Sequence, residues 1–222
     1  MQEASSLDFM PRRLHMFAIN GFTAFVAFVG VAGCTTVPTS LPVAIGSILS
    51  QSELASILPS KDLDGNTLPV GTVATIYYFT GPECPISRAY SPEVARLAAR
   101  DRTRGVVWVM AFPEEGITAE NIRTFQREYS LSLPSFLDTS NALCCDLGVQ
   151  VIPSVAVVSA SGQLIYRGRI DNRYKSLGVS LGPPTIRDLD DVVNAVVAGA
   201  PLPPASTPAI GCVLAPCGSA RF

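Results

Sequence analysis

Histidine is almost absent from this sequence, with His15 as its one occurrence. Without a histidine base or ligand, Ser-His-Asp and Cys-His catalysis are excluded, as are histidine-rich zinc sites and the common iron triads. His15 also lies in a segment that we expect to be removed from the mature protein. Any chemistry must therefore rest on carboxylates, hydroxyls or the six cysteines, and we expect no metal ion and no other cofactor.

The sequence also has no large excess of positive or negative charge. Charged residues make up 15% of the 222 residues, and 16 Lys and Arg stand against 18 Asp and Glu, without basic runs. Binding to phosphates needs clustered cations, so we expect no nucleic-acid partner. The length is enough for one domain of ordinary size with some appendages.

Residues 1–33 have the layout of an export signal peptide. Arg12 and Arg13 precede an apolar stretch, residues 16–33, that ends in small residues. The VAGC sequence that ends at Cys34 resembles the bacterial lipobox, which implies cleavage before a lipidated Cys34. The alternative is a plain transmembrane anchor, because a run of about 18 residues suffices for a short span.

A tether is expected to follow the signal, over residues 34–48. Its TTVPTSLP segment, residues 35–42, is built from Thr, Ser and Pro without an apolar period. By the sorting habit of such lipoproteins, Thr35 at the second mature position favours the outer membrane, with the domain facing the periplasm. Disulfides persist in that part of the cell envelope.

The rest of the chain alternates strand and helix patterns, which predicts an α/β sandwich with a central sheet of about five strands over residues 49–198. A Pro-rich tail, residues 199–222, holds Cys212 and Cys217. Pro92 is expected to kink or restart the first helix. The expected strands are 73–79, 105–112, 135–137 and a hairpin turning at residues 161–162, and the expected helices are 87–100, 118–129, 140–147 and 185–198. The last helix is expected to turn Ile186, Leu189, Val193 and either Val196 or Val197 inward.

Cys84 is the strongest candidate for chemistry. It comes directly after the first buried strand and just before a helix. At a helix N-terminus the free N–H groups and the helix dipole favour a thiolate. We therefore expect Cys84 to have a lowered pKa.

Two motifs resemble those of the thioredoxin-like superfamily. Residues 79–87, FTGPECPIS, resemble its active-site turn, with CPIS where many members carry CxxC. Residues 148–154, GVQVIPS, and the hairpin after them resemble its cis-proline segment. YSPEV, the 166–174 run and the IGC tail at 210–212 further resemble a bacterial redoxin-domain (AhpC/TSA-like) lipoprotein group. The two motifs and the element order cover roughly residues 50–198.

This resemblance implies a thiol–disulfide oxidoreductase that acts on protein or small-molecule thiols and disulfides. Cys84 would be the nucleophile, Ser87 would donate its hydroxyl to the thiolate, and Pro153 would be in cis, which is uncommon for X-Pro bonds. The cis bond would expose the backbone of Ile152 to an extended substrate. The implied substrate-binding residues are Ile152, Pro82 and Glu83.

The sequence also departs from the family pattern. Ser87 stands where a second thiol would release a bound substrate, so a dithiol cycle cannot run at this turn alone. Tyr78 stands where many thioredoxins bury an acid. The peroxiredoxin pattern PxxxTxxC is broken at Tyr77 and Gly81, and a copper-chaperone pattern would need cysteine at Arg88. A peroxiredoxin-like thiol peroxidase and a non-catalytic binding module are the alternatives that stay open.

The other cysteines have two interpretations each. Cys144 and Cys145 are either small buried core residues or thiols that resolve Cys84. Cys212 and Cys217 are spaced for a small disulfide loop, and the rival interpretation is that Cys212 swings back to resolve Cys84. Of the five cysteines left when Cys34 is lipidated, at least one must stay unpaired.

A polar run follows the hairpin, at the end of its second strand. Alternate side chains along a strand share one face. The run is either a solvated edge or the lining of a groove for a substrate or partner. Its members are Arg167, Arg169, Asp171, Arg173 and Tyr174.

Overall fold

The computed structural model describes residues 42–47 and 56–217. The predicted export signal, the predicted lipidation site at Cys34 and most of the predicted tether lie outside the described residues. Within the described part of the chain, no helix is both long enough and apolar enough to cross a membrane.

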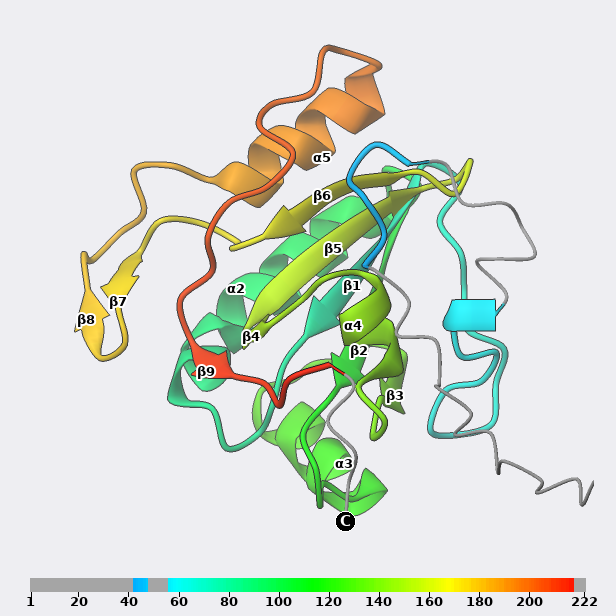
Figure 1. The fold of residues 1–222 in the computed structure, drawn as a ribbon, viewed down its shortest axis with the longest axis vertical. Coiled ribbons are helices and arrows are strands. Elements are labelled where there is room, and N and C mark those ends of the chain that lie inside the picture. The colour runs from blue at the N-terminus through cyan, green and yellow to red at the C-terminus, as the bar shows by residue number, and fades with distance from the viewer. Residues whose placement is uncertain (1–41, 48–55, 218–222) are drawn as a thin grey trace, which may run out of the picture. The chain divides into compact units, whose positions relative to one another are not determined.

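Five strands form the central sheet, in the order β3-β2-β1-β5-β6 (Figure 1). β1, β2 and β3 run parallel, whereas β5 is antiparallel to both β1 and β6. The expected five-stranded α/β sandwich is therefore confirmed. The strands are β1 (Ala74–Phe79), β2 (Val106–Phe112), β3 (Ser135–Leu137), β5 (Ser154–Ser159) and β6 (Leu164–Gly168).

β1 lies at the centre of this sheet, and all six of its residues are buried. A strand that is covered on both faces needs mostly apolar side chains, and the ATIYYF sequence meets this need apart from the hydroxyls of one threonine and two tyrosines. Thr75 is satisfied, because its hydroxyl accepts a hydrogen bond of 3.0 Å from the N–H of Gly71. β1 is thus buried along its whole length up to the turn that follows it.

Helices connect and flank the strands. α2 (Pro85–Arg102) continues through Pro92, so the expected restart of the helix does not occur. α3 (Ala119–Glu128) begins with a full capping box, in which the Asn121 side chain accepts from the N–H of Thr118 at 3.0 Å. Asparagine can accept this bond as the usual Glu or Gln does. α4 spans Ala142–Asp146.

The last helix, α5 (Asp188–Ala198), begins three residues later than the sequence predicts. Its buried residues are Leu189, Val192 and Val193. The expected inward position of Ile186 is wrong, since this residue is 49% exposed. Of the alternatives Val196 and Val197, Val196 packs against the core and Val197 is exposed. Ile186 precedes the helix, where the helical period does not apply.

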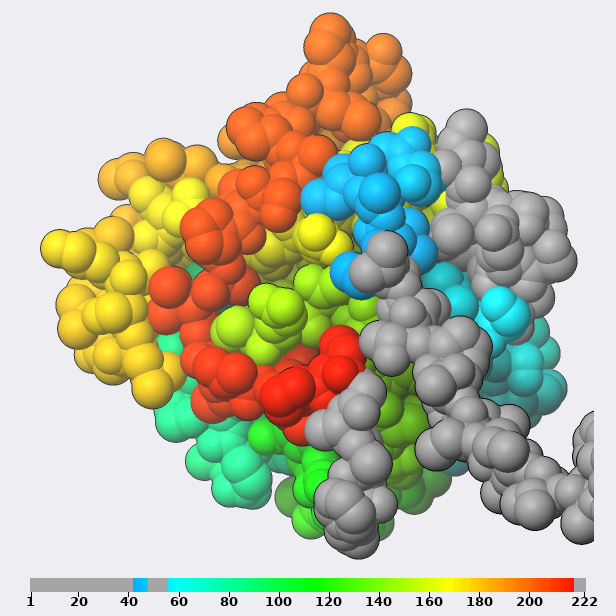
Figure 2. Space-filling model, in the orientation of Figure 1, coloured from blue at the N-terminus to red at the C-terminus, as the bar shows by residue number. Residues whose placement is uncertain are grey.

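Two small sheets complete the fold. β7 (Tyr174–Ser176) pairs with β8 (Val179–Ser180), and β4 (Val151–Ile152) pairs antiparallel with β9 (Cys212–Val213). After α5 the tail runs back along β6, where the N–H of Arg167 donates to the carbonyl of Ala205 at 3.1 Å (Figure 1). In Figure 2 this tail forms a continuous orange-to-red band across the face shown.

The polar run after β6 is an internal network. Asp171 is 3% exposed, accepts from the phenol of Tyr90 at 2.7 Å and pairs with Arg173 at 2.7 Å. Arg169 pairs with Asp188 at the start of α5, also at 2.7 Å. These bonds attach the segment to α2 and α5, so the interpretation as a solvated edge is wrong for Asp171.

Candidate active site

Cys84 is the N-cap residue of α2, at the end of the turn that leaves β1. Its N–H donates to the carbonyl of Gly81 at 3.2 Å, which closes the turn. The thiol makes no cap bond to the helix and instead donates to the carbonyl of Ile152 at 3.5 Å. Cys84 is 1% exposed. The sulfur therefore lies where the sequence predicts, but it is covered.

The Ile152–Pro153 peptide bond is cis, as the sequence predicts. It lies between β4 and β5, so the chain turns from the small sheet into the central sheet there. This arrangement brings the carbonyl of Ile152 against the Cys84 thiol, although 68 residues separate the two in sequence.

The C-terminal tail occupies the edge of β4 at this point. Cys212 pairs with Ile152 in the β4–β9 ladder, and the Cys212 thiol donates to the Cys84 sulfur at a distance of 3.0 Å. The approach of the two strands requires glycine before Cys212, because a Cβ atom on Gly211 would lie 1.9 Å from the Ile152 carbonyl oxygen. The backbone that was expected to bind substrate is thus covered by the protein's own tail.

The surroundings of Cys212 raise the pKa of its thiol. Burial, the hydrogen bond to Cys84, the charge of Cys84 and the charge of Glu114 together raise the pKa of Cys212 to about 12. Cys212 stays a thiol near neutral pH unless a base removes its proton.

Ser87 does not take its predicted role in this structure. It is completely buried, and its hydroxyl oxygen accepts from the N–H of Gly81 at 3.4 Å. No hydrogen bond joins Ser87 to Cys84 among the described residues. One helical turn after the cap, Ser87 faces the inside of the turn and supports its backbone.

The remaining turn residues differ in exposure. Pro82 is buried, and its carbonyl accepts from the Nε of Arg88 at 2.5 Å. The Glu83 side chain is 82% exposed and lies 3.7 Å from the guanidinium of Arg88. Of the two expected substrate-binding residues in this turn, Glu83 is the one that solvent reaches.

The cysteine pairing differs from the expected one. Cys217 forms a disulfide with Cys145, so the predicted Cys212–Cys217 loop is wrong, and Cys145 is not available to resolve Cys84 while this bond exists. Cys144 is a buried free thiol whose sulfur donates to the carbonyl of Asn141 at 3.1 Å. Burial and the neighbouring Asp138 raise the pKa of Cys144 to about 12. Cys144 therefore matches the core interpretation.

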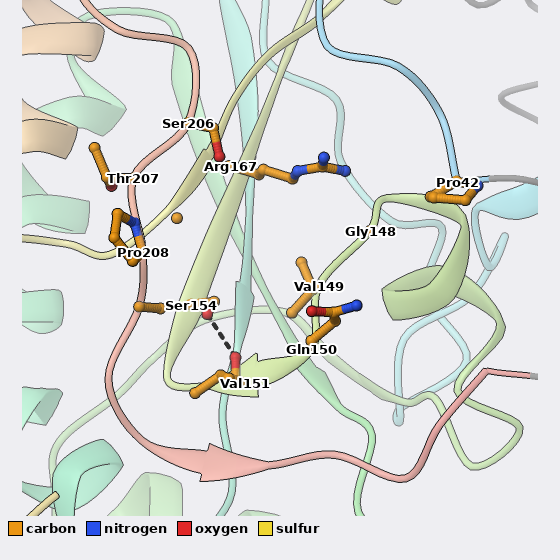
Figure 3. A pocket seen from close by; sticks show the side chains of 12 residues that line it. Pro42, Gly148, Val149, Gln150, Val151, Ser154, Arg167, Ser206, Thr207 and Pro208 are labelled. Carbon is orange, nitrogen blue, oxygen red and sulfur yellow. Dashed lines mark hydrogen bonds between the residues drawn. The ribbon is translucent and has the colours of Figure 1, made fainter. Parts of the chain in front are cut away.

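A cavity of about 390 Å³ separates the tail from the loop before β4 (Figure 3). Arg167 extends into it from β6, and its guanidinium donates to the carbonyl of Leu147 at 3.2 Å. Residues 206–209 of the tail line the opposite side, and no cysteine lines the cavity. Before β9 the tail is therefore not packed tightly against residues 148–151.

Glu114 belongs to this region and was missed by the sequence analysis. Its Oε2 atom is buried and has no hydrogen-bond partner among the described residues. The residue follows β2, the parallel neighbour of β1, and the carboxyl ends of parallel strands meet at one edge of a sheet. Its place after a buried strand was a signal that could have identified it.

No family model and no curated protein matches the chain. An uncharacterized conserved protein from Geobacillus kaustophilus is 22% identical, with a TM-score of 0.64 over 72% of this chain and 88% of that one. A hypothetical protein from Sinorhizobium meliloti is 18% identical, with a TM-score of 0.65 over 78% and 94%. The thioredoxin domain of a thiol-disulfide oxidoreductase from Bacteroides vulgatus is 15% identical, with a TM-score of 0.48 over 72% and 99%. The likenesses to the first two proteins are of fold alone, and the fold of this chain is an α/β sandwich around a five-stranded mixed sheet.

Proposed function

We propose that this protein is a thiol–disulfide oxidoreductase of the cell envelope, with Cys84 as the nucleophile and Cys212 as the resolving thiol. The observation that carries the proposal is the 3.0 Å distance between the two sulfur atoms beside the cis Ile152–Pro153 bond. This distance is about 1 Å longer than a disulfide bond, which measures about 2.05 Å. Cys212 thus supplies the second thiol that the turn lacks at Ser87.

The exchange takes place in two steps. The Cys84 thiolate attacks one sulfur of a substrate disulfide, forms a mixed disulfide and releases the other substrate sulfur as a thiolate. Cys212 then loses its proton and attacks the Cys84 sulfur, which releases the second substrate thiolate and leaves a Cys84–Cys212 disulfide. The substrate gains two electrons and the protein loses two. In the reverse direction the protein disulfide oxidises a substrate dithiol.

Access to Cys84 requires the tail to move. Cys84 is 1% exposed, and β9 covers the edge of β4 on which an extended substrate would pair. β9 is only two residues long, and its Val213 side chain is 81% exposed. Few buried contacts hold such a strand, so opening by local separation of β9 from β4 requires less free energy than global unfolding.

The location in the envelope is part of the proposal. Lipidation of Cys34 would hold the domain at the membrane, and the tether after it would let the domain reach partners there. The Cys145–Cys217 disulfide supports an oxidising compartment, because such bonds persist outside the cytosol. We also propose that the protein belongs to the AhpC/TSA-like redoxin group and that its anchor lies in the outer membrane. Labelling of cells with a radioactive fatty acid tests the anchor, and Cys34→Ser is expected to abolish the label.

Exchange with insulin or glutathione disulfide tests the function. We expect Cys84→Ser to abolish turnover, and we expect Cys212→Ser to accumulate a mixed disulfide between Cys84 and the substrate, visible by intact mass. Cys144→Ala is the matched control, since this buried thiol lies outside the pair and the variant should turn over normally.

Three outcomes would contradict the proposal. Turnover that survives Cys84→Ser would exclude the nucleophile, and no trapped species in Cys212→Ser would exclude the resolving role. Rapid peroxide consumption without disulfide exchange would favour the thiol peroxidase instead.

A further inference from the structure

Glu114 is placed over the active-site turn. A Cβ atom on Gly81 would lie 1.6 Å from Oε2 of Glu114 and 2.9 Å from Cδ1 of Ile152. The carboxylate therefore packs against the Gly81 backbone, on the side of the turn where Ile152 also lies. Ile152 is in turn the residue whose carbonyl accepts from Cys84 and whose strand pairs with Cys212.

A buried carboxylate oxygen without a partner is costly and uncommon, so it needs an explanation. A structural role would give the oxygen a hydrogen-bond donor, and no described residue supplies one. Burial raises the pKa of Glu114, and the neighbouring carboxylate of Glu83 raises it further. The group is thus a stronger base than an ordinary glutamate while it remains ionised.

We propose that Glu114 accepts the proton that Cys212 must lose when it resolves the mixed disulfide on Cys84. In this step the Cys212 sulfur bonds to the Cys84 sulfur, the bond from Cys84 to the substrate breaks, and the substrate leaves as a thiolate. The proton of Cys212 ends on Glu114, so the negative charge passes from Glu114 to the leaving thiolate. This inference rests on the proposed thiol–disulfide exchange and deepens it.

Two features of the site favour this assignment. The surroundings of Cys212 raise the pKa of its thiol, so the attack of Cys212 on the mixed disulfide needs a base. The carboxylate of Glu114 lies on the same side of Gly81 as the side chain of Ile152, and Ile152 pairs with Cys212 in the β4–β9 ladder. The charge of Glu114 is also one of the causes that raise the pKa of Cys212. Proton transfer requires direct contact or one intervening water.

The other titratable groups around the pair do not fit the role. Tyr78 is completely buried, and burial raises its pKa well above the ordinary value, so its phenol keeps its proton. Glu83 is exposed and lies near Arg88, and the charge of Glu83 is not among those that act on Cys212.

A single-turnover reaction with the chromogenic disulfide dithionitrobenzoate tests the step. Reduced Cys84 releases one coloured thiolate in a phase that depends on reagent concentration. Cys212 then releases a second coloured thiolate in a phase whose rate does not depend on reagent concentration. The Cys212→Ser variant should lack this second phase. We expect Glu114→Gln, which keeps the size of the side chain, to slow the second phase by roughly 100-fold near neutral pH and to remove the Glu114 inflection from its pH profile. The first phase should not change.

Glu115→Gln is the matched control, since Glu115 is the next residue and is exposed. It should keep both phases and the wild-type pH profile. A second phase with the wild-type rate and profile in Glu114→Gln would overturn this inference and leave the proposed function standing. The absence of the second phase from the wild-type protein would instead contradict the proposed function itself. Equal slowing in both variants would show an effect of net charge and would also overturn the inference.

Discussion

The Cys145–Cys217 disulfide is expected to be the main constraint on the tail, and its removal tests this view. The bond joins residues that are 72 apart in sequence, from α4 to the end of the described tail. Cys217 is exposed and Cys145 is half-buried. Replacing both by serine therefore removes the cross-link with little loss of packing.

The expected cost comes from the unfolded chain. A cross-link lowers the entropy of the unfolded state by an amount that grows with the closed loop, and a separation of 72 residues corresponds to about 4 kcal/mol. For a domain of this size the melting temperature should fall by roughly 10 °C. The variant should also open its tail more often, so that Cys84 is alkylated faster in the folded protein.

Denaturant unfolding followed by circular dichroism measures the first effect, and alkylation followed by mass spectrometry measures the second. Both proteins are compared with and without a dithiol reductant, in a Cys212→Ser background so that the Cys84–Cys212 pair cannot respond. The reductant should destabilise the protein that keeps Cys145 and Cys217, and it should not affect the variant. This comparison separates the cross-link from the side-chain changes.

Three results would refute the reasoning. Peptide mapping that finds Cys145 and Cys217 unlinked in the oxidised protein would show that no cross-link constrains the tail. A loss of less than about 1 kcal/mol, with the link present, would show that the cross-link does not restrict the unfolded chain as loop entropy requires. An unchanged alkylation rate at Cys84 would show that β9 is held by its own pairing.

Two further predictions concern packing and charge. Gly211→Ala places a Cβ atom 1.9 Å from the Ile152 carbonyl oxygen, so β9 must leave β4. Because overpacking costs about 1–3 kcal/mol, the alkylation of Cys84 should accelerate roughly tenfold or more. An unchanged alkylation rate would contradict the close packing of Gly211 against Ile152. For Asp171, burial raises the pKa, but hydrogen bonds from Arg173 and Tyr90 outweigh burial and leave it lowered. A lowered folded-state pKa stabilises the fold above the unfolded value of about 3.9, and this contribution is lost as pH falls through the folded value. Asp171→Asn should therefore flatten the acid side of the stability profile, and a profile that keeps the wild-type slope would count against the network.

Much of the fold could be predicted because its signals are local. The apolar runs that became β1 and β2 cannot be exposed, and β3 was predicted with the bounds that the structure shows. A helix after Cys84 was also predicted, from residue 87, and α2 begins two residues earlier at Pro85, which suits the first position of a helix. The start of α5 was misplaced because the apolar period of the helix was extended back to Ile186, which is exposed.

The sequence by itself determined the strands of the central sheet and the place of Cys84 at a helix N-terminus, because each depends on a pattern within a few residues. The cis bond before Pro153 was predicted from the resemblance of residues 148–154 to a cis-proline segment. Only the tertiary structure decided which thiol meets Cys84, that Cys217 bonds to Cys145, and that a carboxylate after β2 lies over the turn. These contacts join segments more than thirty residues apart. Their existence depends on where the tail returns to the sheet, and no local preference of the chain specifies that path.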